Sequence, residues 1–173
     1  LAARTIKAIR AIDPKTPIIV ESDRMAHHDD LEFLPVFDAP NIIYSIHFYT
    51  PGQLTHQLRP DQKPFQGYPD ESKGYNKEYL RKQLAAAREF QQKTGARIYV
   101  GEFGCIRWAP GAADYLKDLI DIFEEYHWDW SYHAFREWPG WSVEYSDNPE
   151  ENTPVPNTKR KEVLLEGLKK NVK

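Results

Sequence analysis

Short apolar runs alternate with helical patterns along the whole chain, and this alternation limits the folds open to it. Runs that are apolar on both faces are typical of buried parallel strands. The expected strands lie at 17–22, 41–49, 97–102 and 130–136. Helical spacing marks the segments 1–12, 29–37, 76–95, 112–126 and 158–168. Strands that alternate with helices predict an α/β fold with a parallel sheet and crossover helices.

Two architectures satisfy this order of elements, a doubly wound open sheet and a closed barrel. No Gly-rich phosphate loop follows any expected strand, so the nucleotide-binding form of the wound sheet has no support. The chain contains no internal repeat, and its 173 residues suffice for one domain with a sizeable core. We therefore expect a single domain over residues 1–173.

Polar side chains stand where each expected strand ends. Glu21 follows the first apolar run, His47 and Tyr49 end the second, Glu102 ends the third, and 136–138 (Arg-Glu-Trp) follow the fourth. Reactive groups of parallel α/β folds collect at the carboxyl ends of strands. His47 and Tyr49 occupy alternate positions of one strand and so point to the same face. The sequence therefore predicts a functional site at this edge of the sheet.

Glu102 is the most informative of these residues. It follows a run suited to a buried strand and stands between Gly101 and Gly104, where glycine allows close approach of a backbone or a ligand. A carboxylate in this position costs free energy unless it is paired or hydrogen-bonded. Catalysis is one interpretation of Glu102. The alternative is a structural ion pair with Arg97, Arg107 or Arg136.

These residues resemble the motifs of glycoside hydrolase family 5, a family of endo-β-1,4-glucanases, mannanases and relatives. The family has a His-x-Tyr pair at strand six of a (β/α)8 barrel, here His47-Phe48-Tyr49. Its nucleophile stands at strand seven in a Gly-Glu-Phe-Gly context, here 101–104, and a sugar-stacking Trp follows strand eight, here Trp138. The resemblance implies that the chain is the half of a TIM barrel that holds strands five to eight with their helices.

The resemblance also implies a mechanism, the retaining hydrolysis of a β-1,4-linked glucan. Glu102 would be the nucleophile, Tyr49 would hold its carboxylate, and His47 would contact the sugar or the acid/base region. Trp138 would stack on a sugar face, with Trp141 and Trp108 as secondary candidates. No metal or organic cofactor is implied. The substrate could be cellulose, mannan, xyloglucan or lichenan, with specificity expected in the segments 50–75 and 137–157.

One part of the family pattern is missing from this sequence. The acid/base Glu of the family follows an Asn at strand four, and the one similar segment here, 148–151, lies late in a loop. A half-barrel would expose strand edges, which tend to pair, so we expect a homodimer that closes the barrel and brings Glu137 of the partner subunit near the acid/base position. Glu21 and Glu144 are other candidates. The alternative function is an inactive fragment or a sugar-binding half-barrel without the acid.

Charge and composition exclude some partners. The net charge is −3 and no basic stripe is present, so we expect no nucleic-acid partner. The cluster 159–161 is expected to be a solvated helix face, and no apolar run has the roughly 18 residues that cross a membrane. The single cysteine, Cys105, is expected to fill space in the core. No signal peptide is in view, although the family implies a secreted or periplasmic protein.

Overall fold

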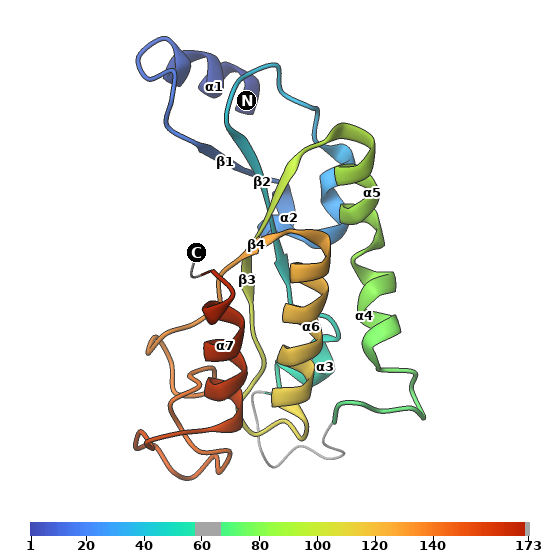
Figure 1. The fold of residues 1–173 in the computed structure, drawn as a ribbon, viewed down its shortest axis with the longest axis vertical. Helices are drawn as coiled ribbons and strands as arrows, with labels where there is room; N and C mark the ends of the chain where they lie inside the picture. The colour runs from blue at the N-terminus through green and yellow to red at the C-terminus, as the bar shows by residue number, and fades with distance from the viewer. Residues whose placement is uncertain (58–66, 172–173) are drawn as a thin grey trace.

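The computed structural model describes residues 1–57 and 67–171, which form a parallel four-stranded sheet with helices alongside it (Figure 1). The strands are β1 (Ile18–Glu21), β2 (Ile42–Phe48), β3 (Arg97–Phe103) and β4 (Asp129–Trp130). They are hydrogen-bonded in the order β1-β2-β3-β4, and every pair is parallel. A doubly wound sheet reverses its strand order at a switch point. The described strands follow the order of the sequence without a reversal, as in a barrel.

Helices or helical turns connect these strands. Figure 1 shows α6 and α7 side by side, with α4 and α5 following one another along the other side of α6. The helical elements are α1 (Ala2–Arg10), α2 (Asp23–Ala26), the 3₁₀ helix η1 (His28–Phe33), α3 (Gly52–Thr55), α4 (Lys77–Gln83), α5 (Ala85–Thr94), α6 (Ala112–Tyr126) and α7 (Lys159–Lys169).

The two faces of the sheet have different roles. Alternate residues of β2, Tyr44, Ile46 and Phe48, are buried in a core that also contains Leu116 and Leu119 of α6. Side chains alternate between the faces of a strand, so the residues between them point to the other face. The helices therefore cover one face with apolar packing, and the opposite face is left for polar side chains.

A β-bulge in β3 decides which face Glu102 occupies. Ile46 pairs with Val100 but His47 pairs with Glu102, so Gly101 is an extra residue without a partner in β2. Without this residue, simple alternation would turn Glu102 toward the helices. A side chain at position 101 would also place its Cβ 2.6 Å from Ser45 Oγ, so glycine is required there. The bulge thus places Glu102 beside His47 on the open face.

Several helix ends agree with the sequence prediction. The side chain of Asn76 accepts a hydrogen bond from the Tyr79 amide at the start of α4, and that of Thr158 accepts one from the Lys161 amide at the start of α7. Gly95 ends α5 in the left-handed conformation. The predicted helix over 76–95 is interrupted at its centre, where α4 ends and α5 begins.

Other expected boundaries were wrong. The strand expected at 130–136 is regular only over β4, although the chain still follows β3 because the amides of Ser131 and His133 donate to the carbonyls of Val100 and Phe103. The helix expected at 29–37 is the shorter η1. The segment 50–75, in which no helix was expected, contains α3, and its residues 58–66 lie outside the described residues.

Candidate active site

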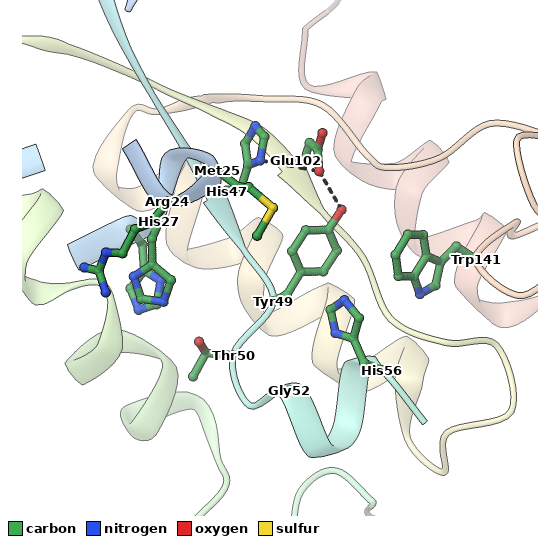
Figure 2. Close-up of a pocket in the computed structure, with 11 residues that line it drawn as sticks. Arg24, Met25, His27, His47, Tyr49, Thr50, Gly52, His56, Glu102 and Trp141 are labelled. Atoms are coloured by element: carbon green, nitrogen blue, oxygen red, sulfur yellow. Dashed lines mark hydrogen bonds and ion pairs between the residues drawn. The ribbon is translucent and has the colours of Figure 1, made fainter. Parts of the chain in front are cut away.

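The carboxylate of Glu102 lies among three side chains of the open face. The Tyr49 hydroxyl donates a hydrogen bond of 3.0 Å to Oε2 of Glu102. Nδ1 of His47 lies 3.5 Å from the same oxygen, and Nδ1 of His133 lies 4.0 Å from it. Figure 2 shows His47 and Tyr49 converging on Glu102. The structure thus brings together His47, Tyr49 and Glu102, which the sequence predicted to lie at strand ends.

The alternative of a structural ion pair for Glu102 was wrong. The Arg97 guanidinium pairs with Asp129, and that of Arg136 pairs with Glu144. The Arg107 guanidinium donates to backbone carbonyls of the segment 146–151. Within the described part of the chain, none of these arginines forms an ion pair with Glu102. Its carboxylate is held by a neutral hydroxyl and faces histidines.

Tyr49 is suited to hold this carboxylate in one orientation. Burial, together with the negative charge of Glu102 and the hydrogen bond to it, raises the pKa of Tyr49 well above its usual value. The hydroxyl therefore keeps its proton at neutral pH and acts as a donor. The ring is fixed as well, because it stacks on Trp141 at 5.6 Å between ring centroids and meets His56 edge-on at 5.1 Å.

His133 belongs to this cluster and was not predicted from the sequence. Its Nδ1 lies 2.9 Å from the Tyr49 hydroxyl, and its Nε2 lies 2.8 Å from Oε2 of Glu137. One chain of polar contacts therefore joins Glu102, Tyr49, His133 and Glu137. The signal was present in the sequence, because His133 lies in the last apolar run, two residues from Ser131, and alternate positions share a face.

The three glutamates considered for the acid/base role have different surroundings. Oε1 of Glu21 accepts a hydrogen bond from Ser45 and lies 3.4 Å from Nε2 of His47. Glu137 contacts His133, and its side chain is 65% exposed. Glu144 is paired with Arg136, whose hydrogen bond and charge lower the pKa of Glu144. Glu21 and Glu137 are each separated from Glu102 by a single imidazole ring.

Three tryptophans form a continuous cluster beside Tyr49. The rings of Trp141 and Trp138 meet edge-on at 5.7 Å, and those of Trp138 and Trp108 at 6.1 Å. The indole nitrogens of Trp108 and Trp141 donate to the carbonyls of Gln57 and Thr55, which orients both rings. Trp138 is the most exposed of the three, at 39%. It therefore presents the accessible ring, and Trp141 forms the wall beside Tyr49.

A pocket of about 480 Å³ opens over this cluster. His47, Tyr49 and Glu102, at the ends of β2 and β3, line it together with Trp141. Figure 2 shows Arg24 and His27 across the pocket from Trp141, on the segment that follows β1. Pockets of this size take ligands of a few rings, and aromatic lining with a few polar groups is their usual composition. Trp108, Trp138 and Glu137 lie outside the pocket lining.

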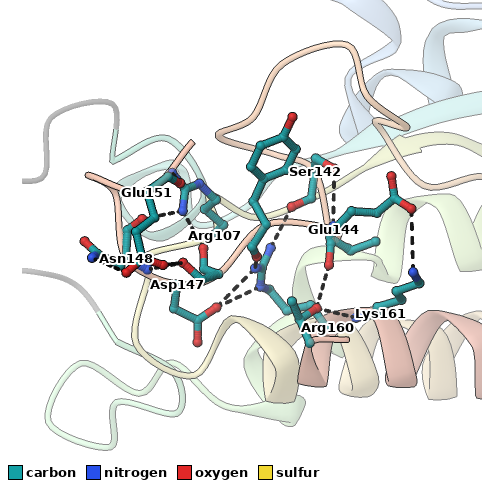
Figure 3. Close-up of polar contacts among 12 residues, drawn as sticks. Arg107, Ser142, Glu144, Asp147, Asn148, Glu151, Arg160 and Lys161 are labelled. Carbon is teal, nitrogen blue, oxygen red and sulfur yellow. Dashed lines mark hydrogen bonds and ion pairs between the residues drawn. The ribbon is translucent and has the colours of Figure 1, made fainter. Parts of the chain in front are cut away.

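Two buried arginines hold the segment 137–157, which carries Trp138 and Trp141. Arg107 is 1% exposed and Arg160 is 2% exposed. Figure 3 shows both guanidinium groups inside this segment, where Arg160 donates to the carbonyls of Ser142 and Tyr145 at 3.0 and 2.6 Å. The expectation of a solvated face at 159–161 was therefore wrong for Arg160. Its donors supply hydrogen bonds to carbonyls that are not bonded within a helix or a sheet.

Two further observations concern the sequence predictions. Cys105 is fully buried and free, as expected of a residue that fills the core, and burial raises the pKa of its thiol. Among residues 1–57 and 67–171, no helix has both the length and the hydropathy needed to cross a membrane.

Comparisons with known proteins agree with the resemblance. The family model of cellulases, glycoside hydrolase family 5, matches residues 1–137. Endoglucanase C of Acetivibrio thermocellus is 30% identical over 155 residues, which cover 73% of this chain and 45% of that protein. Cellodextrinase A of Ruminococcus flavefaciens is 30% identical over 115 residues, 65% of this chain and 34% of that protein.

Solved structures show the same partial coverage. Cel5A of Thermotoga maritima, in complex with cellobiose, superimposes with a TM-score of 0.73 at 26% identity over 97% of this chain and 53% of that chain. The cellulose synthase subunit Z of Clostridioides difficile superimposes with a TM-score of 0.75 at 23% identity, over 95% and 53%. The predicted α/β fold is confirmed. The chain spans about half the length of the TIM-barrel relatives that it matches.

Proposed function

Because this chain belongs to glycoside hydrolase family 5, the cellulase family, we propose that it forms the nucleophile-bearing half of a retaining hydrolase of β-1,4-linked glucan, of the endoglucanase type. The observation that carries the proposal is the 3.0 Å hydrogen bond from Tyr49 to Glu102 at the carboxyl ends of β2 and β3. Reactive groups of barrel enzymes collect at this end of the strands. Since the chain covers only about half the length of its relatives, the full activity belongs to a completed barrel.

The two oxygens of Glu102 have different tasks in this mechanism. The contacts of Tyr49, His47 and His133 all reach Oε2, and among the described residues no hydrogen bond reaches Oε1. Oε1 can attack the anomeric carbon while Tyr49 fixes the carboxylate. A bond forms between Glu102 and that carbon, and the glycosidic C–O bond breaks as its oxygen takes a proton from the acid. Water then hydrolyses the glycosyl ester.

The proton of Tyr49 must be directed to Glu102 and not to His133. A His133 ring with its hydrogen on Nδ1 donates it to the Tyr49 oxygen, which lies 2.9 Å away. The Tyr49 proton is then left for Glu102. His47 contacts the sugar near the reacting centre. Trp138 and Trp141 supply apolar ring faces for the C–H side of a pyranose, with Trp108 behind Trp138.

The acid/base carboxylate must lie roughly 5 Å from the nucleophile. Glu144 is unsuited, because Arg136 keeps its carboxylate ionised. Glu21 and Glu137 each contact an imidazole ring that lies between them and Glu102. The acid/base therefore comes from outside this set of contacts. We propose a homodimer in which Glu137 of the partner subunit supplies it, since two halves close one barrel.

Substitution of Glu102 tests the proposal. Glu102→Gln keeps the size and hydrogen bonding of the side chain but removes the attacking charge, and it should abolish turnover of carboxymethylcellulose. Glu78→Gln is the matched control, because this carboxylate lies on α4 and its side chain is 83% exposed. Turnover that persists in Glu102→Gln contradicts the assignment. A monomeric mass by light scattering in a fully active sample contradicts the dimer.

A second candidate function, sugar binding without hydrolysis, is favoured by the cluster of Trp108, Trp138 and Trp141. Aromatic faces bind sugars whether or not an acid is present. Under this alternative the chain binds cello-oligosaccharides with equal affinity before and after Glu102→Gln, and neither form releases reducing ends. Trp138→Ala should weaken binding under both functions, so the release of reducing ends decides between them.

A further inference from the structure

A cluster of three consecutive side chains, His27, His28 and Asp29, lies where α2 passes into η1. One ring nitrogen of each histidine and one carboxylate oxygen lie within 4.8 Å of one another. Oδ1 of Asp29 is 3.4 Å from Nε2 of His28, and Oδ2 is 3.8 Å from Nδ1 of His27. Ligands on a tetrahedral Zn²⁺ at bond lengths of ~2.0–2.1 Å stand about 3.4 Å apart. Asp29 already stands near this distance from each ring, through a different oxygen for each.

His28 gives an independent reason to look for a ligand here. The residue is 2% exposed, and within the described part of the chain neither ring nitrogen forms a hydrogen bond. Buried polar groups in folded proteins are nearly always satisfied. The ring is held in place because it meets Phe48 of β2 edge-on at 4.8 Å between centroids. A fixed, buried imidazole with unused nitrogens beside a carboxylate is suited to bind a cation.

We propose that His27, His28 and Asp29 bind a divalent transition-metal ion of the Zn²⁺ class at the wall of the pocket. Two imidazole nitrogens and one carboxylate oxygen are donors that suit Zn²⁺, Cu²⁺ or Ni²⁺, whereas Ca²⁺ and Mg²⁺ require sets of oxygens. Water completes the coordination on the exposed side, where the Asp29 side chain is 53% accessible.

The ion would stabilise a segment whose backbone is otherwise strained. Arg24, Met25 and Ala26 have φ angles of 50°, 57° and 57°, a left-handed conformation that L-residues avoid. A backbone bridge joins His27 to His47, so this segment is attached to β2. Since His27 and His28 also line the pocket, the bound ion would fix the wall opposite Trp141.

Zinc titration of the tag-free chain tests this proposal. Isothermal titration calorimetry should give one Zn²⁺ per chain, with Ca²⁺ and Mg²⁺ binding far more weakly. Asp29→Asn and His27→Gln each remove a ligand from a side chain that is not buried, and each should weaken zinc binding by at least about tenfold. Hydrogen exchange of the segment 23–33 should slow when Zn²⁺ is added to the unsubstituted chain.

The controls separate this site from other zinc ligands in the chain. Asp23→Asn removes an exposed carboxylate of α2 outside the cluster, and His127→Asn removes an exposed imidazole far along the sequence. Both should bind zinc as the unsubstituted chain does, and circular dichroism checks that all variants are folded. Equal affinity in Asp29→Asn and Asp23→Asn overturns the proposal. Binding that is lost in Glu102→Gln but kept in Asp29→Asn overturns it as well.

Discussion

Replacement of Arg160 by Met should strongly destabilise the chain while keeping the length and apolar stem of the side chain. The guanidinium is 2% exposed and donates to the carbonyls of Ser142 and Tyr145. It also forms an ion pair of 3.1 Å with Asp147. The substitution removes every donor at once and leaves backbone carbonyls of the segment 137–157 without partners.

The size of the effect follows from these contacts. Each buried carbonyl left without its donor costs about 1–3 kcal/mol, so the loss of the Arg160 donors from two carbonyls costs about 2–6 kcal/mol. The Asp147 side chain is 78% exposed, so its ion pair contributes at most about 1 kcal/mol. The carbonyl contacts therefore carry most of the expected loss. A typical domain has a stability of ~5–15 kcal/mol, so Arg160→Met removes a large share of it.

Urea unfolding, followed by circular dichroism and tryptophan fluorescence, measures these differences. Arg160→Met should lower the free energy of unfolding by about 2–6 kcal/mol, and the matched variant Asp147→Asn by at most about 1 kcal/mol. Arg160→Lys keeps the charge but lacks the planar fork of donors, so it should fall between them. The reasoning is refuted if Asp147→Asn costs as much as Arg160→Met, because the ion pair would then outweigh the carbonyl bonds.

Three further predictions concern other parts of the chain. Tyr49→Phe should lower turnover of carboxymethylcellulose by roughly 10–100-fold, since a hydrogen bond to a charged group contributes about 1.5–3 kcal/mol; unchanged kcat would contradict its orienting role. Gly111→Ala should lower the melting temperature, because φ is +76° and the new Cβ would lie 1.6 Å from the Tyr68 carbonyl oxygen, whereas Gly52→Ala, with nothing within 4 Å, should be tolerated. Burial lowers the pKa of His56 from 6.5, so the unfolded chain binds more protons there and stability should fall as the pH drops through 6.5; urea unfolding from pH 7.5 to 5 should show a smaller decline in His56→Asn.

The sequence was sufficient to predict the sheet and the face on which His47 and Tyr49 lie. Alternation over β2 determined both, because a two-residue period assigns each side chain to a face. The position of Glu102 required more than alternation, because the bulge at Gly101 turns it toward His47. A bulge depends on the register between two strands, and the sequence of one strand does not contain that register.

Residues outside regular elements were harder to predict. The cluster 159–161 has the composition of a solvated face, yet Arg160 is buried by carbonyls of the segment 137–157. Those carbonyls belong to backbone outside the helices and strands, so no periodic pattern in the sequence predicts that they surround Arg160. The alternation of the last apolar run indicated the face of His133, but its contacts with Tyr49 and Glu137 depend on the path of the chain beyond β4.

The two sides of the candidate active site therefore depend on different parts of the fold. Tyr49 and Glu102 are placed by β2 and β3, whose packing against α6 is apolar and extensive. Glu137 and Trp141 stand on a segment that Arg107 and Arg160 hold through backbone carbonyls. Substitution of either arginine should therefore free Glu137 and Trp141 before it disturbs Tyr49 and Glu102. A partly destabilised variant would then keep the Tyr49–Glu102 hydrogen bond and lose the aromatic wall, so its affinity for sugar would fall before its sheet unfolds.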